Sequence, residues 1–286
     1  MGSRFCVVPY ENLKEGRLIR DVPVAGVKNL WELVECLKNP EPYLKREIQE
    51  EIPSIINTDM GMDFSDIEGQ EGAKRAAEIA VSGFHNLLLI GPPGTGKTML
   101  ARRLPTIMPG LGFEEKLELT RIYSIAGLLS REHPLIDERP FRSPHHTSTP
   151  QAIAGGGRNP RPGEITLAHK GVLFLDEMPE FSRASLELLR QPMEDKVIQI
   201  ARASGTYNFP ADFMLCAAMN PCPCGYYPDL NRCTCTAGEI THYMGKISRP
   251  LLDRIDISTE VPPVSFSQLH CGSCLLYTSP SPRDRG

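Results

Sequence analysis

The sequence predicts an α/β fold in which a parallel sheet is covered by helices. Three short apolar runs support this prediction, at residues 87–90, 171–175 and 213–218. Such continuous runs are typical of strands that are buried on both faces of a sheet. Because they alternate with segments of helical periodicity, we expect the strands to lie parallel to one another.

The composition excludes several classes of protein. The 286 residues are 41% hydrophobic and 23% charged, with a mean hydropathy of −0.24, which excludes disordered and collagen-like chains. No stretch approaches the roughly 18 consecutive apolar residues of a membrane helix, and residues 1–5 lack the apolar core of a signal peptide. We therefore expect a cytoplasmic protein. The formal charge of −4 implies that any nucleic acid is bound through a local basic patch.

The character of the chain changes near Asp63. Residues before Asn57 mix short apolar runs with an amphipathic segment at 30–37 and show no catalytic spacing. After Asp63 an alanine-rich helical period at 72–80 leads into the first apolar run. We therefore expect one domain at residues 1–57 and a second at 58–264.

The last residues differ from the rest of the chain. Residues 274–284 have no amphipathic period and resemble the in-frame translation of a transposase-type sequencing adapter. We therefore leave residues 271–286 out of the fold prediction and expect the chain to be a fragment of a longer protein. The alternative is a disordered natural tail.

The first apolar run leads into a glycine-rich loop of the pattern G-x-x-x-x-G-K-[ST]. A helical segment at 99–104 follows, which is the context that a phosphate-binding loop requires. Its glycines let backbone N–H groups converge on phosphate oxygens at a helix N-terminus. We expect Lys97 to contact the β- and γ-phosphates of ATP and Thr98 to offer its hydroxyl to Mg²⁺. The expected nucleotide-binding residues are Gly91, Pro92, Pro93, Gly94, Thr95, Gly96, Lys97 and Thr98.

Hydrolysis needs further groups, and the other two runs end in suitable side chains. The second run ends in two adjacent acids, of which Asp176 can hold the Mg²⁺ shell and Glu177 can orient and deprotonate the attacking water. The third run ends near Asn220. Ligands collect at the carboxyl ends of strands in open α/β sheets, so Asn220 is a candidate to position the same water. An asparagine in this position is also a common turn residue.

Four of the nine cysteines lie close together in the sequence. Cys222, Cys224, Cys233 and Cys235 offer four thiolates, enough for a closed tetrahedral Zn²⁺ site of structural kind. The C-x-C spacing differs from the C-x₂-C of standard zinc ribbons, so free thiols and redox chemistry remain alternatives. The isolated cysteines Cys6, Cys36 and Cys216 are interpreted as small buried apolar residues.

Residues 141–163 contain no Asp or Glu. They include three arginines and two histidines beside a run of glycines, namely Arg142, Arg158, Arg161, His145 and His146. A flexible loop with local positive charge suits phosphate backbones, and a plain solvated loop is the alternative. The two histidines have no further ligands at a recognisable metal-binding spacing.

The order of these motifs resembles that of AAA+ ATPases. Several phrases are similar, more narrowly, to the magnesium chelatase-like ComM/YifB family over residues 5–264. They are Gly69-Gln70-Glu71, His85-Asn86-Leu87-Leu88, Pro144-His145-His146-Thr147, Pro162-Gly163-Glu164-Ile165, Asn220-Pro221-Cys222-Pro223-Cys224-Gly225 and Leu251-Leu252-Asp253-Arg254-Ile255-Asp256.

This resemblance implies a particular domain order. The ATPase of the family lies between an N-terminal domain related to the Lon protease fold and a C-terminal helical lid. Residues 1–57 resemble only the end of that N-terminal domain, and the lid is missing from this chain. Both features agree with the expectation of a fragment.

The resemblance also implies an arginine finger. Arg254 is expected to reach the γ-phosphate bound by a neighbouring subunit, where a guanidinium stabilises charge on the transferring phosphoryl group. Arg249 is the alternative finger, although the family usually has glycine at that position. Either arginine can instead be a surface salt-bridge partner.

The function implied by the resemblance is that of a Mg²⁺-dependent, ATP-hydrolysing motor. It is expected to form a homo-hexameric ring and to face DNA with residues 141–163, which we call the basic insert. Its expected work is to remodel DNA by helicase-type branch migration during recombination of incoming DNA. One alternative is a motor subunit that drives Mg²⁺ insertion into a tetrapyrrole, although the chain offers no tetrapyrrole site. The other is a truncated fragment that binds nucleotide without turnover.

Overall fold

The computed structural model describes residues 5–17, 22–46, 63–129, 135–157, 160–202 and 205–263. The chain divides into two compact units. One unit contains residues 1–58 and 128–136, and the other contains residues 59–127 and 137–286. Residues 271–286, where we expect the adapter-derived tail, lie outside the described residues, and so does Arg158.

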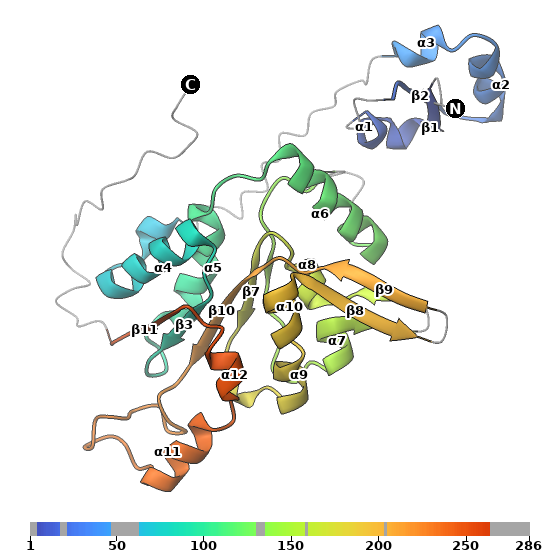
Figure 1. Cartoon of the computed structure of the whole chain (residues 1–286). Coiled ribbons are helices and arrows are strands. Elements are labelled where there is room, and N and C mark those ends of the chain that lie inside the picture. The colour runs from blue at the N-terminus through green and yellow to red at the C-terminus, as the bar shows by residue number, and fades with distance from the viewer. Residues whose placement is uncertain are drawn as a thin grey trace. The chain divides into compact units, whose positions relative to one another are not determined.

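A five-stranded parallel sheet forms the centre of the second unit, in the order β11-β3-β10-β7-β4 (Figure 1). Its strands are β3 (Leu87–Ile90), β4 (Phe141–Arg142), β7 (Val172–Leu175), β10 (Met214–Met219) and β11 (Ile257–Glu260). Strand β10 lies between β3 and β7, although it follows both in the chain. The α/β class and the parallel order predicted from the three apolar runs are therefore confirmed.

Both faces of this sheet are covered, which explains why its strands are apolar without alternation. In β10, Met214, Cys216 and Ala218 belong to one hydrophobic cluster, which includes side chains of α4 (Glu71–Gly83) and α5 (Lys97–Ile107). The alternate residues of β10 belong to a second cluster on the other face. Helices thus lie on both sides of the sheet, and its carboxyl edge is left for polar side chains.

The remaining helices and hairpins of the second unit surround this core. The helices are η2 (Phe64–Asp66), α6 (Phe113–Ala126), α7 (Pro150–Ala154), α8 (Glu164–Leu167), η3 (Met178–Glu180), α9 (Arg183–Glu187), α10 (Arg190–Asp195), α11 (Ala237–Met244) and α12 (Arg249–Leu252). Two antiparallel hairpins pair β5 (Gly155–Gly156) with β6 (Arg161–Pro162) and β8 (Val197–Arg202) with β9 (Gly205–Pro210).

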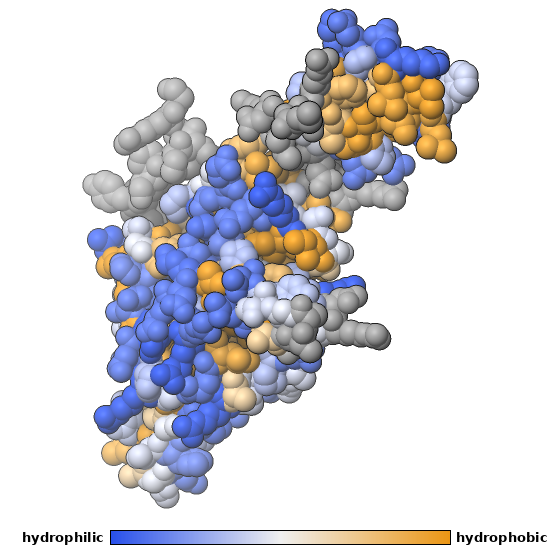
Figure 2. Space-filling model, turned by 45° about the vertical axis from the view of Figure 1, so that its right-hand side comes forward, coloured by the Kyte–Doolittle hydropathy of each residue, from blue (hydrophilic) through white to orange (hydrophobic). Residues whose placement is uncertain are grey.

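The first unit contains a small parallel pair of strands and short helices. They are β1 (Cys6–Pro9), η1 (Tyr10–Asn12), α1 (Leu13–Gly16), β2 (Val24–Val27), α2 (Leu30–Lys38) and α3 (Glu41–Leu44). Helix α2 exposes apolar side chains, with Trp31 at 73%, and Figure 2 shows this unit's apolar surface. Cys36 and Cys216 are buried as expected, but Cys6 is exposed, because it occupies an outward-facing position of the two-stranded pair. The relation of this unit to the Lon protease fold stays a prediction.

Across the described ranges, every helix is too short or too polar to cross a membrane.

Candidate nucleotide-binding site

Three neighbouring strands deliver the predicted site residues to one edge of the sheet. The phosphate-binding loop follows β3, the pair Asp176 and Glu177 follows β7, and Asn220 follows β10. Because β10 lies between the other two strands, Asn220 lies between the loop and the acids. The register pairs Met219 with Ile90, so the two strands end side by side.

The loop from Gly91 to Gly96 has the shape of an anion cradle. Gly94 and Gly96 have φ angles of 77° and 87°, which favour glycine and turn successive N–H groups toward one side. A side chain at Gly91 would collide with the backbone oxygen of Val261. Within the described part of the chain, no side chain caps the first turn of α5, so its N–H groups are open to a phosphate.

Lys97 is folded against this loop. Its ammonium donates to the backbone oxygens of Gly91 at 2.7 Å and Pro92 at 2.8 Å, and to the side-chain oxygen of Asn220 at 3.2 Å. The residue is only 8% exposed, and this burial lowers the pKa of Lys97, whereas Asp176 and Glu177 act to raise it. An ammonium with three donors in this position can exchange carbonyl partners for phosphate oxygens.

Thr98 and Asp176 form the second link across the sheet edge. The Thr98 hydroxyl donates to Oδ2 of Asp176 at 2.7 Å, while Oδ1 of Asp176 accepts the N–H of Glu177 at 3.0 Å. A hydroxyl and a carboxylate are oxygen ligands of the kind that Mg²⁺ prefers. The side chain of Glu177 remains 60% exposed and extends away from this pair toward His146. The residues present therefore fit a Mg²⁺–nucleotide complex.

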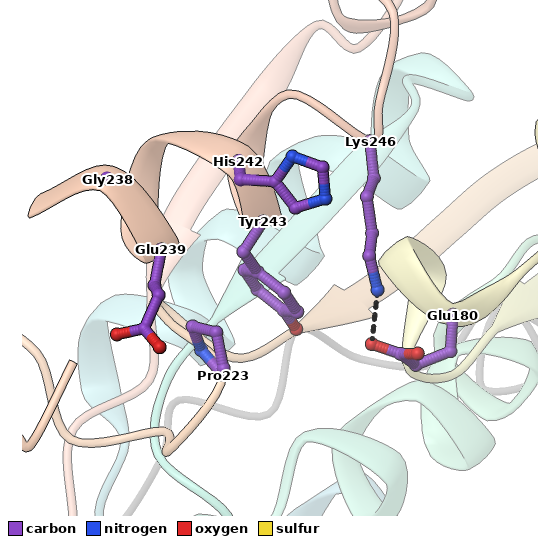
Figure 3. Close-up of a pocket in the computed structure, with 7 residues that line it drawn as sticks. All are labelled: Glu180, Pro223, Gly238, Glu239, His242, Tyr243 and Lys246. Atoms are coloured by element: carbon purple, nitrogen blue, oxygen red, sulfur yellow. Dashed lines mark hydrogen bonds and ion pairs between the residues drawn. The ribbon is translucent and has the colours of Figure 1, made fainter. Parts of the chain in front are cut away.

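Helix α11 supports the Asn220 side of the site. Its Tyr243 is buried, and this burial raises the pKa of the phenol to about 12. Figure 3 shows Tyr243 between Pro223 and an ion pair of Lys246 with Glu180, which measures 3.0 Å. These residues line an open pocket of about 500 Å³ that lies between α11 and the end of η3. The segment that follows Asp176 and Glu177 thus contacts the segment that follows Asn220.

The four clustered cysteines converge in space. Cys222 Sγ lies 3.3 Å from Cys224 Sγ and 3.8 Å from Cys233 Sγ, and all four sulfur atoms, including that of Cys235, lie within 4.8 Å of one another. A hydrogen bond from the backbone of Tyr226 is the main cause that lowers the pKa of Cys224 to about 6. Four convergent sulfur atoms fit the ligand set of a tetrahedral metal ion.

Arg254 forms its hydrogen bonds with residues of its own chain. Its guanidinium donates to the carbonyl of Pro250 and to the carboxylate of Glu194 on α10, and its Nε is buried without a partner among the described residues. Asn86 fixes the backbone of this segment, because its side chain donates to the Arg254 carbonyl at 2.8 Å and accepts from the N–H of Leu215 at 2.9 Å. Arg249 is exposed at the start of α12, and we find no ion pair for it in the described ranges.

The basic insert is less open than its sequence suggests. Arg142 forms two hydrogen bonds to the carboxylate of Glu164, at 2.7 and 2.8 Å, and this partner raises the pKa of the guanidinium. The acid-free stretch ends at Gly163, so the neutralising acid is the very next residue. Arg142 is therefore a structural residue, whereas Arg161 is exposed on β6.

Two contacts of the site were not predicted. Gln70 has a positive φ of 59°, and its side-chain nitrogen donates to the carbonyls of Thr95 at 3.3 Å and Pro262 at 2.5 Å. His146 lies 3.5 Å from the carboxylate of Glu177. Both residues lie in sequence segments on which the family resemblance is based, and that resemblance is the signal that could have identified them. Nothing in their local sequence specifies the partners that they contact.

The comparisons with known proteins agree with this geometry. Residues 63–269 match the family model described as magnesium chelatase, subunit ChlI. The chain is 50% identical to the uncharacterized protein YifB of Escherichia coli strain K12, over 87% of this chain and 46% of that protein. It is 43% identical to the competence protein ComM of Haemophilus influenzae, over 91% and 51%. It is 45% identical to the uncharacterized protein Rv2897c of Mycobacterium tuberculosis, over 89% and 50%.

The chain spans about half the length of these curated relatives. The similarity nevertheless covers most of the described residues, and the family model includes the loop at 91–98, the acids after β7 and the cysteine cluster. The five-stranded parallel sheet with its phosphate-binding loop is a P-loop domain of AAA+ type. The chain therefore belongs to the magnesium chelatase ChlI family, as a chain of the ComM/YifB type.

Proposed function

We propose that this chain is the motor domain of a Mg²⁺-dependent ATPase that acts on DNA. The observation that carries the proposal is the pair of links across the sheet edge, from Lys97 to Asn220 and from Thr98 to Asp176. These links gather a phosphate-binding ammonium, two oxygen ligands and a polar amide at one place. That set of groups matches the requirements of phosphoryl transfer to water.

Each residue has a distinct part in this proposal. Lys97 binds the β- and γ-phosphate oxygens. Thr98 and Asp176 would hold the Mg²⁺ ion, which would supply positive charge to the phosphate oxygens. Glu177 accepts a proton from the attacking water. Both oxygens of Asp176 already accept hydrogen bonds, from Thr98 and from the N–H of Glu177, whereas the carboxylate of Glu177 is exposed. Asn220 orients that water from the neighbouring strand.

The proposed assembly is a homo-hexameric ring with active sites between subunits. In that arrangement Arg254 leaves Glu194 and contacts the γ-phosphate bound by the adjacent subunit. The side chain of Glu194 is 59% exposed, so water can solvate its carboxylate when Arg254 leaves. The exposed Arg249 is the alternative finger.

DNA is the proposed partner of the basic insert, with branch migration as the work performed. The support is the ComM/YifB resemblance, together with the name of one relative, a competence protein. Arg161 supplies exposed positive charge on the short hairpin β5–β6, which suits contacts to phosphates. Arg158 is part of the same proposal but lies outside the described residues.

A structural Zn²⁺ ion at the four cysteines completes the proposal. The support is that the four sulfur atoms converge on one point. Free thiols in a loop would have no reason to do so. The ion would fasten the segment between Asn220 and α11. It would act through folding and not in catalysis.

The proposed function is tested by ATP hydrolysis with and without DNA. We expect Mg²⁺-dependent release of phosphate from ATP that increases when branched or single-stranded DNA is added. If DNA does not change the rate of ATP hydrolysis, the proposed ATPase activity stands and the proposed DNA partner is rejected. Tight ATP binding without turnover would reject the motor function for this chain.

A further inference from the structure

Asn86 lies where three strands of the central sheet begin. It directly precedes β3, at the edge of the sheet opposite the phosphate-binding loop. The next residue, Leu87, pairs with Cys216 of β10 on one side and with Ile257 of β11 on the other. Asn86 is therefore placed beside the starts of both neighbouring strands.

The side-chain amide of Asn86 bridges these two strands. Its Oδ1 accepts the N–H of Leu215 at 2.9 Å, and its Nδ2 donates to the carbonyl of Arg254 at 2.8 Å. An asparagine amide carries an acceptor and a donor on one planar group, so a single side chain makes both bonds. The amide thus ties the backbone of Arg254 to β10, the strand that Asn220 follows at its other end.

The backbone of Arg254 is held from two sides. Its N–H donates to the carbonyl of Leu251 at 3.2 Å, and the side chain of Leu251 is fully buried in the core. Its carbonyl is held by Asn86. The guanidinium lies at the end of a long side chain, so a small rotation of this part of the backbone moves the guanidinium farther than it moves the carbonyl.

We infer that Asn86 is a positioning residue for Arg254. In the proposed ring the guanidinium exchanges Glu194 for a phosphate of the adjacent subunit, whereas the bond to Asn86 uses only the Arg254 backbone and can persist through that exchange. A fixed backbone limits where the guanidinium can reach, and a misplacement of about 1 Å can cost about 100-fold in rate. This inference rests on the proposed function of Arg254 and adds a residue to it.

Two substitutions separate the two side-chain bonds of Asn86. Asn86→Asp keeps an acceptor for the N–H of Leu215 but replaces the donor with an oxygen that repels the Arg254 carbonyl. Asn86→Ala removes both bonds and adds no charge. Both substitutions keep the backbone bonds of Asn86 to Asp256, at 2.8 Å, and to the N–H of Ile257, at 3.0 Å, so β3 and β11 should stay paired.

The first readout is the division of the effect between kcat and KM. We expect Asn86→Asp and Asn86→Ala each to lower kcat by about 10- to 100-fold with little change in KM for ATP, because the finger acts on charge that develops during transfer. His85→Gln is the matched control, because its half-exposed side chain contacts Asp256 and the amide of Asn86 stays in place. A loss confined to Asn86→Ala would assign the effect to the bond with Leu215 and overturn the inference, as would a loss that falls on KM.

The second readout uses the action of a finger on the neighbouring subunit. Lys97→Ala subunits bind nucleotide weakly but keep Asn86 and Arg254. Co-expressed with Asn86→Asp subunits, they should supply fingers to intact nucleotide sites and raise the rate several-fold above the sum of the separate variants. Co-expression of Arg254→Ala with Asn86→Asp should give no such gain, because neither subunit supplies a working finger. If Lys97→Ala rescues Arg254→Ala but neither Asn86→Asp nor the uncharged Asn86→Ala, the inference is overturned.

A third measurement depends on neither turnover nor assembly. The Nε of Arg254 is buried, so ¹⁵N–¹H spectra of arginine-labelled protein should report its N–H, and Arg254→Lys assigns the resonance. We expect Asn86→Asp and Asn86→Ala to shift this resonance and His85→Gln to leave it unchanged. An unshifted resonance would overturn the inference. If Lys97→Ala does not rescue Arg254→Ala, or if wild type hydrolyses no ATP, the proposed function of Arg254 fails, while the spectra still decide whether Asn86 holds that residue.

Discussion

The hydroxyl of Thr98 donates a 2.7 Å hydrogen bond to Asp176, 78 residues further along the chain. Thr98 lies in the first turn of α5, and Asp176 follows β7, which is not adjacent to β3 in the sheet. The bond thus spans the end of β10, the strand that Asn220 follows. It joins the two oxygen ligands that the proposed Mg²⁺ site needs.

Removing the Thr98 hydroxyl should weaken Mg²⁺ binding. For Thr98→Ala we expect the Mg²⁺ concentration for half-maximal ATPase activity to rise by about 10- to 100-fold, the usual cost of removing a metal-site partner. Thr106→Ala is the control, because Thr106 is an exposed threonine of the same helix whose hydroxyl donates to the carbonyl of Arg103. An unchanged Mg²⁺ requirement in Thr98→Ala would remove Thr98 from the site.

The arginine finger can be tested by comparing two residues. We expect Arg254→Ala to lower ATP turnover by about 10³-fold or more in an assembled protein, while ATP binding persists, because the guanidinium acts on charge that develops during transfer. Arg249→Ala should have little effect. The opposite pattern would assign the finger to Arg249, and no effect of either substitution would reject a finger from this part of the chain.

The cysteine cluster predicts one zinc ion per chain. Elemental analysis of protein purified without chelator should show this ratio, and Cys222→Ser should abolish it. Because bound metal contributes to folding, a chelator should lower the melting temperature of wild type but not that of Cys222→Ser. Cys216→Ser is the control, since Cys216 is buried in β10 away from the cluster. Four titratable thiols without zinc would contradict the site.

The basic insert predicts different outcomes for two arginines. Arg161→Ala should weaken DNA binding at every sequence and flatten the slope of log affinity against log salt by about 0.7–0.9 for each DNA phosphate that the variant no longer neutralises. Arg142→Ala should instead lower the free energy of unfolding by about 1–3 kcal/mol, because it leaves the half-buried Glu164 unpaired. A salt slope that is unchanged in Arg161→Ala would move DNA binding elsewhere.

Much of the site could be predicted because its parts are local. The strand at Leu87–Ile90 has the predicted bounds, and the other two runs begin one residue after their predicted starts. A glycine-rich loop and an acidic pair after apolar strands carry their chemistry within a few residues. Parallel order then brings strand ends together without knowledge of any side chain.

The parts that could not be predicted depend on partners far apart in sequence. The ion pair of Arg254 with Glu194 joins residues 60 positions apart, and no local pattern links them. The pairing of Arg142 with Glu164 depends on how β4 and α8 pack. The left-handed backbone of Glu177 is likewise imposed by the turn from β7 into η3, because glutamate has no preference for it.

The separation of nucleotide binding from hydrolysis tests the central claim most directly. Titration with a fluorescent ATP analogue, followed by phosphate release, should be performed on wild type, Lys97→Ala and Glu177→Gln. We expect Lys97→Ala to bind at least about tenfold more weakly, since it loses charge-assisted bonds to phosphate. Glu177→Gln should bind as wild type does while its turnover falls by about 10²–10⁴-fold. Equal nucleotide affinity of Lys97→Ala and wild type, or unimpaired turnover in Glu177→Gln, would contradict the account.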